Sequence, residues 1–226
     1  PYSPGFQSYR HDPRNPGSLS INVVYSINED NAGNLWVGTE NGGVCIYDSA
    51  LGVFHRYQQD DADVTSISHN SIYDLYKDAQ GNMWVGTFAG GICLLNQDIN
   101  KFAHYRHNSR TNSLSHNNVL TITETKSGKL WIGTDGGGAN LFDPLTREFT
   151  HFKNKPGDVK SICGNYVLDI IEDSKGCVWF STWAAGVTLY DPAKNTYKHF
   201  RHNAADPSSI SSNNAWTVYE DREKNI

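Results

Sequence analysis

Short apolar runs separated by clusters of Gly, Asp and Asn recur along the whole chain. In the segment 67–113 the runs cover residues 72–76, 83–87, 91–95 and 102–105. They are rich in β-branched and aromatic residues and are bounded by turn residues, which predicts four short β-strands. Nowhere do about 10–12 consecutive residues show the apolar period of a helix.

The second run of this unit contains a tryptophan that returns at a nearly constant spacing. Trp84 lies in the string Gly-Asn-Met-Trp-Val-Gly-Thr, and related strings surround Trp36, Trp131 and Trp179. These four tryptophans are 48, 47 and 48 residues apart. A constant period of about 20–50 residues indicates a repeat architecture. Four short antiparallel strands per period predict an all-β fold, a β-propeller built from four-stranded blades.

The period divides the chain into four whole units with a part-unit at each end. Residues 1–18 are predicted to hold the last strand of a preceding blade, over 6–10, and a loop. Residues 210–226 are predicted to hold the first strand of a further blade, over 213–221. A fourth strand and a first strand cannot complete one blade, so we expect a partial propeller with an open ring. The predicted whole repeats are residues 19–66, 67–113, 114–161 and 162–209.

Composition narrows the classes of partner. The 226 residues are 38% hydrophobic and 12% aromatic, which is enough for a sizeable core. The net charge is −5 and no run of Lys or Arg occurs, so we expect no nucleic-acid binding. No apolar run approaches the ~20 residues of a membrane helix, so we expect no membrane contact by this part. No cofactor motif is present, and we expect no cofactor.

The four cysteines match no zinc-site spacing, and no metal site is expected. Buried hydrophobic packing is the favoured role for them, because free Cys is among the most buried residue types. Their redox state stays open. The turn Asp78-Ala79-Gln80-Gly81 has too few oxygen ligands for a calcium loop, and a hairpin turn is favoured.

The repeat resembles the two-component regulator propeller repeat. The resemblance is carried by the Asp78-x-x-Gly81-Asn-Met-Trp-Val-Gly-Thr string, the following Gly90-Gly91 and the Ile67-Ser-x-Asn opening, and it recurs four times. It implies a full ring of seven blades in the periplasmic sensor region of a Bacteroides-type hybrid two-component system. Histidine kinase activity would then reside elsewhere in the full-length protein. The fourth unit departs from the pattern at Phe180-Ser181 and Ala184-Ala185.

The resemblance further implies the sensing of glycan breakdown products and the regulation of polysaccharide-utilisation transcription. The implied partners are an oligosaccharide, neighbouring domains of the same sensor chain and a second copy in a homodimer. Two alternatives remain open. Trp179-Phe180-Ser181-Thr182 also resembles the streptogramin-lyase type of propeller enzyme. A purely structural interaction module is the other alternative. No residue is predicted to be catalytic.

The four tryptophans are interpreted as structural, because a residue needed once per blade serves packing between blades. The candidate site consists instead of residues that differ between the copies. They fall on the face where the turns between the second and third strands meet the loops that lead into the first strands. Simple variation of exposed positions, or contact with a neighbouring domain, is the alternative. The aromatic candidates are Trp183, Phe88, Tyr166 and Trp216, and the polar candidates are Asp135, Glu40, His69, His116 and Asn118.

Overall fold

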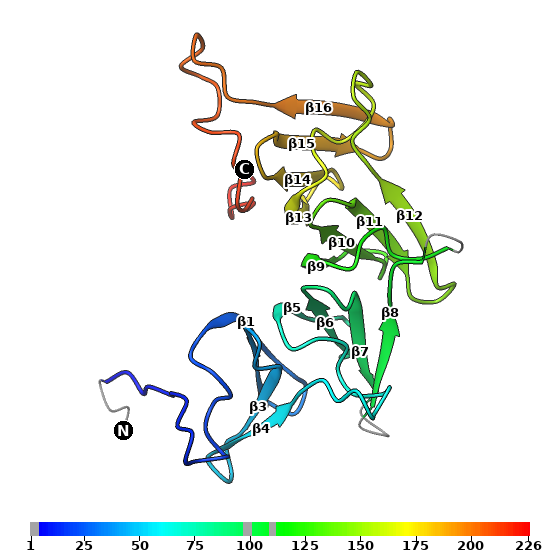
Figure 1. Ribbon diagram of the computed structural model, residues 1–226. Helices are drawn as coiled ribbons and strands as arrows, with labels where there is room; N and C mark the ends of the chain where they lie inside the picture. The colour runs from blue at the N-terminus through cyan, green and yellow to red at the C-terminus, as the bar shows by residue number, and fades with distance from the viewer. Residues whose placement is uncertain (1–4, 97–100, 109–111) are drawn as a thin grey trace.

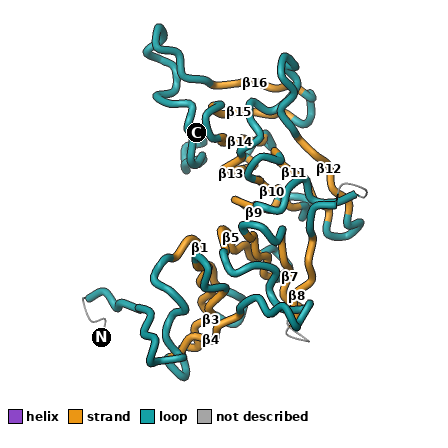
Figure 2. Tube along the Cα trace, in the orientation of Figure 1, coloured by secondary structure: helices purple, strands orange, loops and turns teal. Residues whose placement is uncertain are grey.

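The computed structural model describes residues 5–96, 101–108 and 112–226. Sixteen strands form four antiparallel sheets, and no helix occurs in this described part (Figures 1 and 2). The first two sheets contain β1 (Val24–Glu29), β2 (Leu35–Thr39), β3 (Val44–Asp48), β4 (Val53–Tyr57), β5 (Ile72–Lys77), β6 (Met83–Thr87), β7 (Ile92–Asn96) and β8 (Lys101–Tyr105). The other two contain β9 (Val119–Glu124), β10 (Leu130–Thr134), β11 (Gly138–Asp143), β12 (Glu148–Phe152), β13 (Val167–Glu172), β14 (Val178–Thr182), β15 (Gly186–Asp191) and β16 (Thr196–Phe200).

Each sheet is a meander in which strands pair in the order of the sequence. The tryptophan strand is therefore central and pairs on both sides, as Trp84 does opposite Tyr76 of β5 and Leu94 of β7. The four-stranded antiparallel blades confirm the predicted propeller fold. The four blades form an open arc in Figure 1, with β1, β5, β9 and β13 on the inner side and β4, β8, β12 and β16 outside.

The hydrophobic core lies between neighbouring blades. Trp84 is 1% exposed and belongs to a cluster with Leu130 and Phe142 of the third blade. Trp36 and Trp131 are buried in the same way against the blades that follow them. Trp179, in the fourth blade, is only partly buried and stacks on Phe200 with ring centroids 5.5 Å apart.

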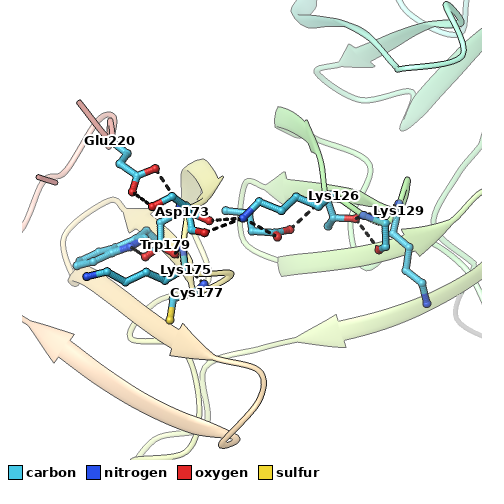
Figure 3. A network of polar contacts seen from close by, with 11 residues as sticks. Lys126, Lys129, Asp173, Lys175, Cys177, Trp179 and Glu220 are labelled. Carbon is cyan, nitrogen blue, oxygen red and sulfur yellow. Dashed lines mark hydrogen bonds and ion pairs between the residues drawn. The ribbon is translucent and has the colours of Figure 1, made fainter. Parts of the chain in front are cut away.

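Polar contacts at the turns between the first two strands also join the blades. Lys126 Nζ donates to the carbonyl oxygens of Asp173 and Ser174, at 2.9 and 3.1 Å. From the other side, the Glu220 carboxylate accepts hydrogen bonds from the N–H and hydroxyl of Ser174. Figure 3 shows the Asp173 turn between Lys126 and Glu220, with the Trp179 indole N–H directed at the Asp173 carboxylate. These turns are hairpins tied to the next blade.

The two terminal segments differ from the prediction. Residues 6–10 and 213–221 form no strand, although both were predicted as strands of part-blades. A strand needs a neighbour to share its backbone hydrogen bonds, and neither segment has a third or second strand of its own blade beside it. Phe6 is fully exposed. The segment 213–221 nevertheless follows β13, because the Val218 N–H donates to Asp169 Oδ2 at 3.0 Å.

The four cysteines are free thiols, and three of them are buried. Burial raises the pKa of the Cys93 thiol, which the Ser68 hydroxyl contacts at 2.9 Å. Within the described ranges, no group of three or more His, Cys, Asp or Glu residues is placed to hold a metal ion. The same ranges contain no helix of the length and apolar character that a membrane crossing requires.

Candidate functional site

One face of the arc is built from the turn between the second and third strands of each blade and the loop that leads into its first strand. We call it the lead-in face. In every blade the residue after the strand-two Thr donates its N–H to the lead-in loop, at 2.9–3.1 Å. The four pairs are Glu40 with Val23, Phe88 with Ser71, Asp135 with Asn118, and Trp183 with Tyr166. The variable positions of the two elements are thus adjacent within each blade.

The turns of this face are held by glycines and by the next blade. Gly91 has a φ of +77°, and its N–H donates to the carbonyl oxygen of Asn117, in the third blade, at 2.9 Å. The side chain of Asn117 accepts a hydrogen bond from the His107 N–H at 2.7 Å. Asn70 and Asn165 make the corresponding two contacts, in which the carbonyl oxygen accepts the turn glycine N–H of the preceding blade and the side chain accepts a backbone N–H. These asparagines therefore fix the backbone of the face.

An open groove of about 480 Å³ lies over the third and fourth blades of this face. Its lining residues are Leu120, Asp135, Tyr166, Leu168 and Trp183. Tyr166 and Trp183 are about half exposed, at 51% and 45%, so their rings are accessible from solvent. The groove combines aromatic and aliphatic surface with one carboxylate.

Trp216 extends the aromatic surface of the groove. Its ring meets that of Trp183 edge to face, with centroids 5.4 Å apart and an interplanar angle of 81°. It lies in the segment 213–221 and is 66% exposed. Asn118 is adjacent through its backbone, since its carbonyl oxygen accepts the Asp135 N–H. His116 belongs to the same lead-in loop, and its Nδ1 accepts the Asn118 N–H at 3.2 Å.

The remaining candidates form a second cluster, over the first and second blades. Phe88 stacks on Tyr73 at 5.7 Å and lies 6.1 Å from the ring of His69. Tyr73 in turn stacks on Tyr25 at 4.8 Å. Burial raises the pKa of Tyr25, and the nearby carboxylate of Glu40 raises it further. The nine candidate residues therefore do not surround one point but divide into a groove and an aromatic stack.

Four residues of these two clusters were not among the sequence candidates: Tyr25, Tyr73, Leu120 and Leu168. All four occupy the second position of a first strand. Trp216 holds the corresponding position after the fourth repeat, which was the signal available in the sequence. The first strands lie on the inner side of the arc (Figure 1), and at this position Tyr25 is exposed while Tyr73, Leu120 and Leu168 are half-buried.

The third position of the first strands holds carboxylates in two blades. Asp74 accepts hydrogen bonds from the N–H of Ile122, in the next blade, at 2.7 Å and from Leu75 at 2.9 Å. Burial raises the pKa of Asp74 to about 6, against the effect of these hydrogen bonds, and the negative charge of Asp169 adds to the rise. Asp169 contacts the segment 213–221 in the same way. These carboxylates join blades.

Histidines of the fourth strands also have structural partners. The Nε2 atoms of His104, His151 and His199 lie 2.7–2.8 Å from the carbonyl oxygens of Ser66, Ser113 and Ser161. Each contact ties an outer strand to the lead-in loop of its own blade. The three histidines belong to three different blades and do not converge on one site.

The family model of the two-component regulator propeller matches four segments of the chain, residues 18–41, 66–89, 113–136 and 161–184. The chain carries four two-component regulator propeller repeats. Each matched segment of the regulator propeller runs from a lead-in loop to the turn after the second strand. The matches therefore include the elements that build the lead-in face. No curated protein matches the chain.

Solved structures resemble the regulator propeller over most of its length. The extracellular domain of the hybrid two-component system BT3049 of B. thetaiotaomicron is 26% identical, with a TM-score of 0.78 over 91% of this chain. That of BT4673 is 19% identical, with a TM-score of 0.72 over 90%. The chain spans 27% and 25% of those two chains.

A propeller enzyme resembles the chain more distantly. Virginiamycin B lyase from Staphylococcus aureus is 14% identical, with a TM-score of 0.56 over 80% of this chain and 56% of its own. At that identity the likeness concerns the fold alone. The likeness gives the lyase alternative from the sequence a shared architecture only.

Proposed function

We propose that the regulator propeller is part of the extracytoplasmic sensor region of a hybrid two-component histidine kinase and response regulator. The observation that carries this proposal is the set of four matched repeats, together with the 26% identity to an extracellular domain of such a system. The location is periplasmic in this proposal. The kinase, the glycan signal and the control of polysaccharide-utilisation transcription belong to the whole protein.

The ligand in this proposal is an oligosaccharide bound in the groove of the third and fourth blades. Tyr166 and Trp183 offer flat, rigid and amphipathic rings, which suit the apolar faces of sugars. Asp135 supplies a polar group at the same place, and a pocket with few placed polar groups on apolar walls is the usual form of a ligand site. The position of Trp216 against Trp183 widens the stacking surface.

Calorimetry with a glycan panel on the sensor region that contains these residues tests the proposal. Trp183→Ala should weaken the binding of the active glycan by at least about tenfold, as expected for an aromatic anchor. Phe88→Ala removes an aromatic ring at the same position of the second blade, outside the groove, and should leave the affinity unchanged. Unchanged affinity in a stably folded Trp183→Ala variant would contradict the groove as the site.

A further inference from the structure

Asp135 is the only charged residue that lines the groove among the described residues. Its backbone is held, because the Asp135 N–H donates to Asn118 and the residue forms a bridge with Tyr166. No described residue donates a hydrogen bond to its carboxylate. The Asp135 carboxylate thus has a fixed backbone and lies beside apolar side chains. A cationic group bound in the groove would stabilise its negative charge.

The loops of the lead-in face contain no Lys or Arg. Neither Lys nor Arg occurs in the lead-in loops 18–23, 66–71, 113–118, 161–166 and 210–214, nor in the turns 40–43, 88–91, 135–138 and 183–186. The two histidines of these loops, His69 and His116, each accept a backbone N–H at Nδ1. Their Nδ1 atoms are therefore engaged within their own lead-in loops.

Other charged residues lie near the groove but are not among the residues that line it. Asp169 follows the lining residue Leu168 on β13, and Asp74 lies on β5, the first strand that precedes β9 of the groove. Arg106, Lys153 and Arg201 follow the outermost strands. The backbone of Lys153 lies against the turn 135–138, and the side chain of Arg201 lies against the turn 183–186, because a Cβ at Gly138 or Gly186 would meet them at 3.2 and 3.3 Å. Neither side chain is among the residues that line the groove, so sulfated or carboxylated sugars would meet no cation in its lining.

We propose that the groove binds a sugar unit that carries a protonated amine. This inference rests on the proposed saccharide site and names its chemical class. The ammonium group forms a charge-assisted hydrogen bond with the Asp135 carboxylate, while the apolar face of the sugar stacks on Trp183. The rings of Tyr166 and Trp183 also favour a cation near their faces. An N-acetylated sugar keeps the stacking contact and loses the charge contact.

Titration calorimetry with three probes on the sensor region tests this. The probes are a glucosamine trimer, an N-acetylglucosamine trimer and an N-sulfated glucosamine trimer. We expect the amine-bearing trimer to bind most tightly and the sulfated trimer most weakly. Asp135→Asn keeps the shape of the side chain and should lower the affinity for the amine-bearing trimer by roughly ten- to a hundredfold. Glu40→Gln changes the same position of the first blade, outside the groove, and should have no effect.

The outcomes separate this inference from the proposed function. Equal binding of the first two trimers, or unchanged affinity of the amine-bearing trimer in Asp135→Asn, overturns the amine preference. The saccharide site then still stands if Trp183→Ala weakens binding. If no trimer binds and the glycan panel finds a neutral or anionic ligand that depends on Trp183, the amine inference alone fails. If no glycan of the panel binds, both proposals fail.

Discussion

The tryptophan of each repeat is positioned by packing and by a hydrogen bond together. In the first, second and fourth blades the indole N–H donates to the carboxylate of an Asp six residues earlier, at 2.8–3.0 Å. In the third blade Thr125 holds the place of that Asp, and Trp131 is still 3% exposed. Packing against the next blade therefore suffices to bury the ring, and the hydrogen bond satisfies its N–H where an acceptor is present.

Trp84→Ala should lower the free energy of unfolding by about 3–5 kcal/mol, the usual cost of removing a large buried aromatic side chain. The ring contacts Tyr105 of its own blade and Phe142 of the next, so its loss opens a cavity between blades. Trp131→Ala should behave alike. Trp179→Ala serves as the comparison and should cost less, because its ring is partly exposed. Denaturant unfolding measures these changes, and a loss under about 1 kcal/mol for Trp84→Ala would contradict a packing role.

Asp74 should make the stability of the chain depend on pH. Its pKa is about 6 in the folded protein and near 4 in an unfolded chain. The folded state thus holds the proton more tightly, so this contribution is complete below pH 4 and is lost as the pH rises through 6. Relative to Asp74→Asn, the wild-type chain should lose about 2–3 kcal/mol of stability between pH 4 and pH 7. Urea unfolding at a series of pH values measures this difference. If the free energies of unfolding of the two proteins change with pH in parallel, the contribution of Asp74 is contradicted.

At the scale of the elements, the turn between the second and third strands recurs with one geometry and different side chains. A glycine with positive φ closes each turn, at Gly43, Gly91, Gly138 and Gly186. Its N–H donates to the lead-in loop of the following blade, or to the segment 213–221 after the fourth. The scaffold is therefore shared by all the turns, while the residue after the strand-two Thr varies freely. This division explains how a repeat fold displays a different surface on each blade.

Gly91→Ala should destabilise the chain by more than the ordinary cost of a left-handed alanine. A Cβ at Gly91 would fall on the carbonyl oxygen of Tyr105. Gly52→Ala is the matched control, since Gly52 has a similar φ of +70° and nothing within 4 Å of its Cβ position. The control should cost about 1–2 kcal/mol and Gly91→Ala clearly more, in denaturant unfolding. Equal losses in the two variants would show that the turn relaxes.

At the scale of the whole molecule, the arc has two unlike ends. The first blade leaves Ile27 58% exposed and Leu35 37% exposed, where an inner blade would be covered by its neighbour. At the other end, Trp216 and Tyr219 are exposed in the segment 213–221. Exposed apolar strands favour pairing with other chains. Because the two ends differ, such contacts would be head to tail rather than symmetric.

The 226-residue chain alone should therefore associate in a concentration-dependent manner in sedimentation velocity. Ile27→Lys places a charge on the exposed side of β1 and should weaken the association. Val64→Lys is the control, because Val64 is 84% exposed in a loop away from the ends of the arc. A monomer at every concentration, or equal effects of the two substitutions, would contradict association through the ends.

The sequence alone was sufficient for the blades, because their determinants are local. Each strand pairs with its neighbours in the chain, so the period of the tryptophans and the Gly and Asp turns specify the meander and its repetition. The apolar runs at 72–76 and 83–87 match β5 and β6 to within one residue. The lead-in loops and turns could also be assigned to one face, since alternate strand connections lie at the same end of a meander.

Only the tertiary structure decided what happens between blades and at the ends. The curvature of the arc separates the aromatic stack of Phe88 from the groove of Trp183, although both residues hold the same position in the repeat. Leu120 and Leu168 lie beside Trp183 in the groove, because their strands, β9 and β13, follow one another along the inner side of the arc. The segment 213–221 reads as a strand in the sequence but lacks a second strand beside it. A strand is a property of a pair of segments, and the pattern within one segment cannot supply the other.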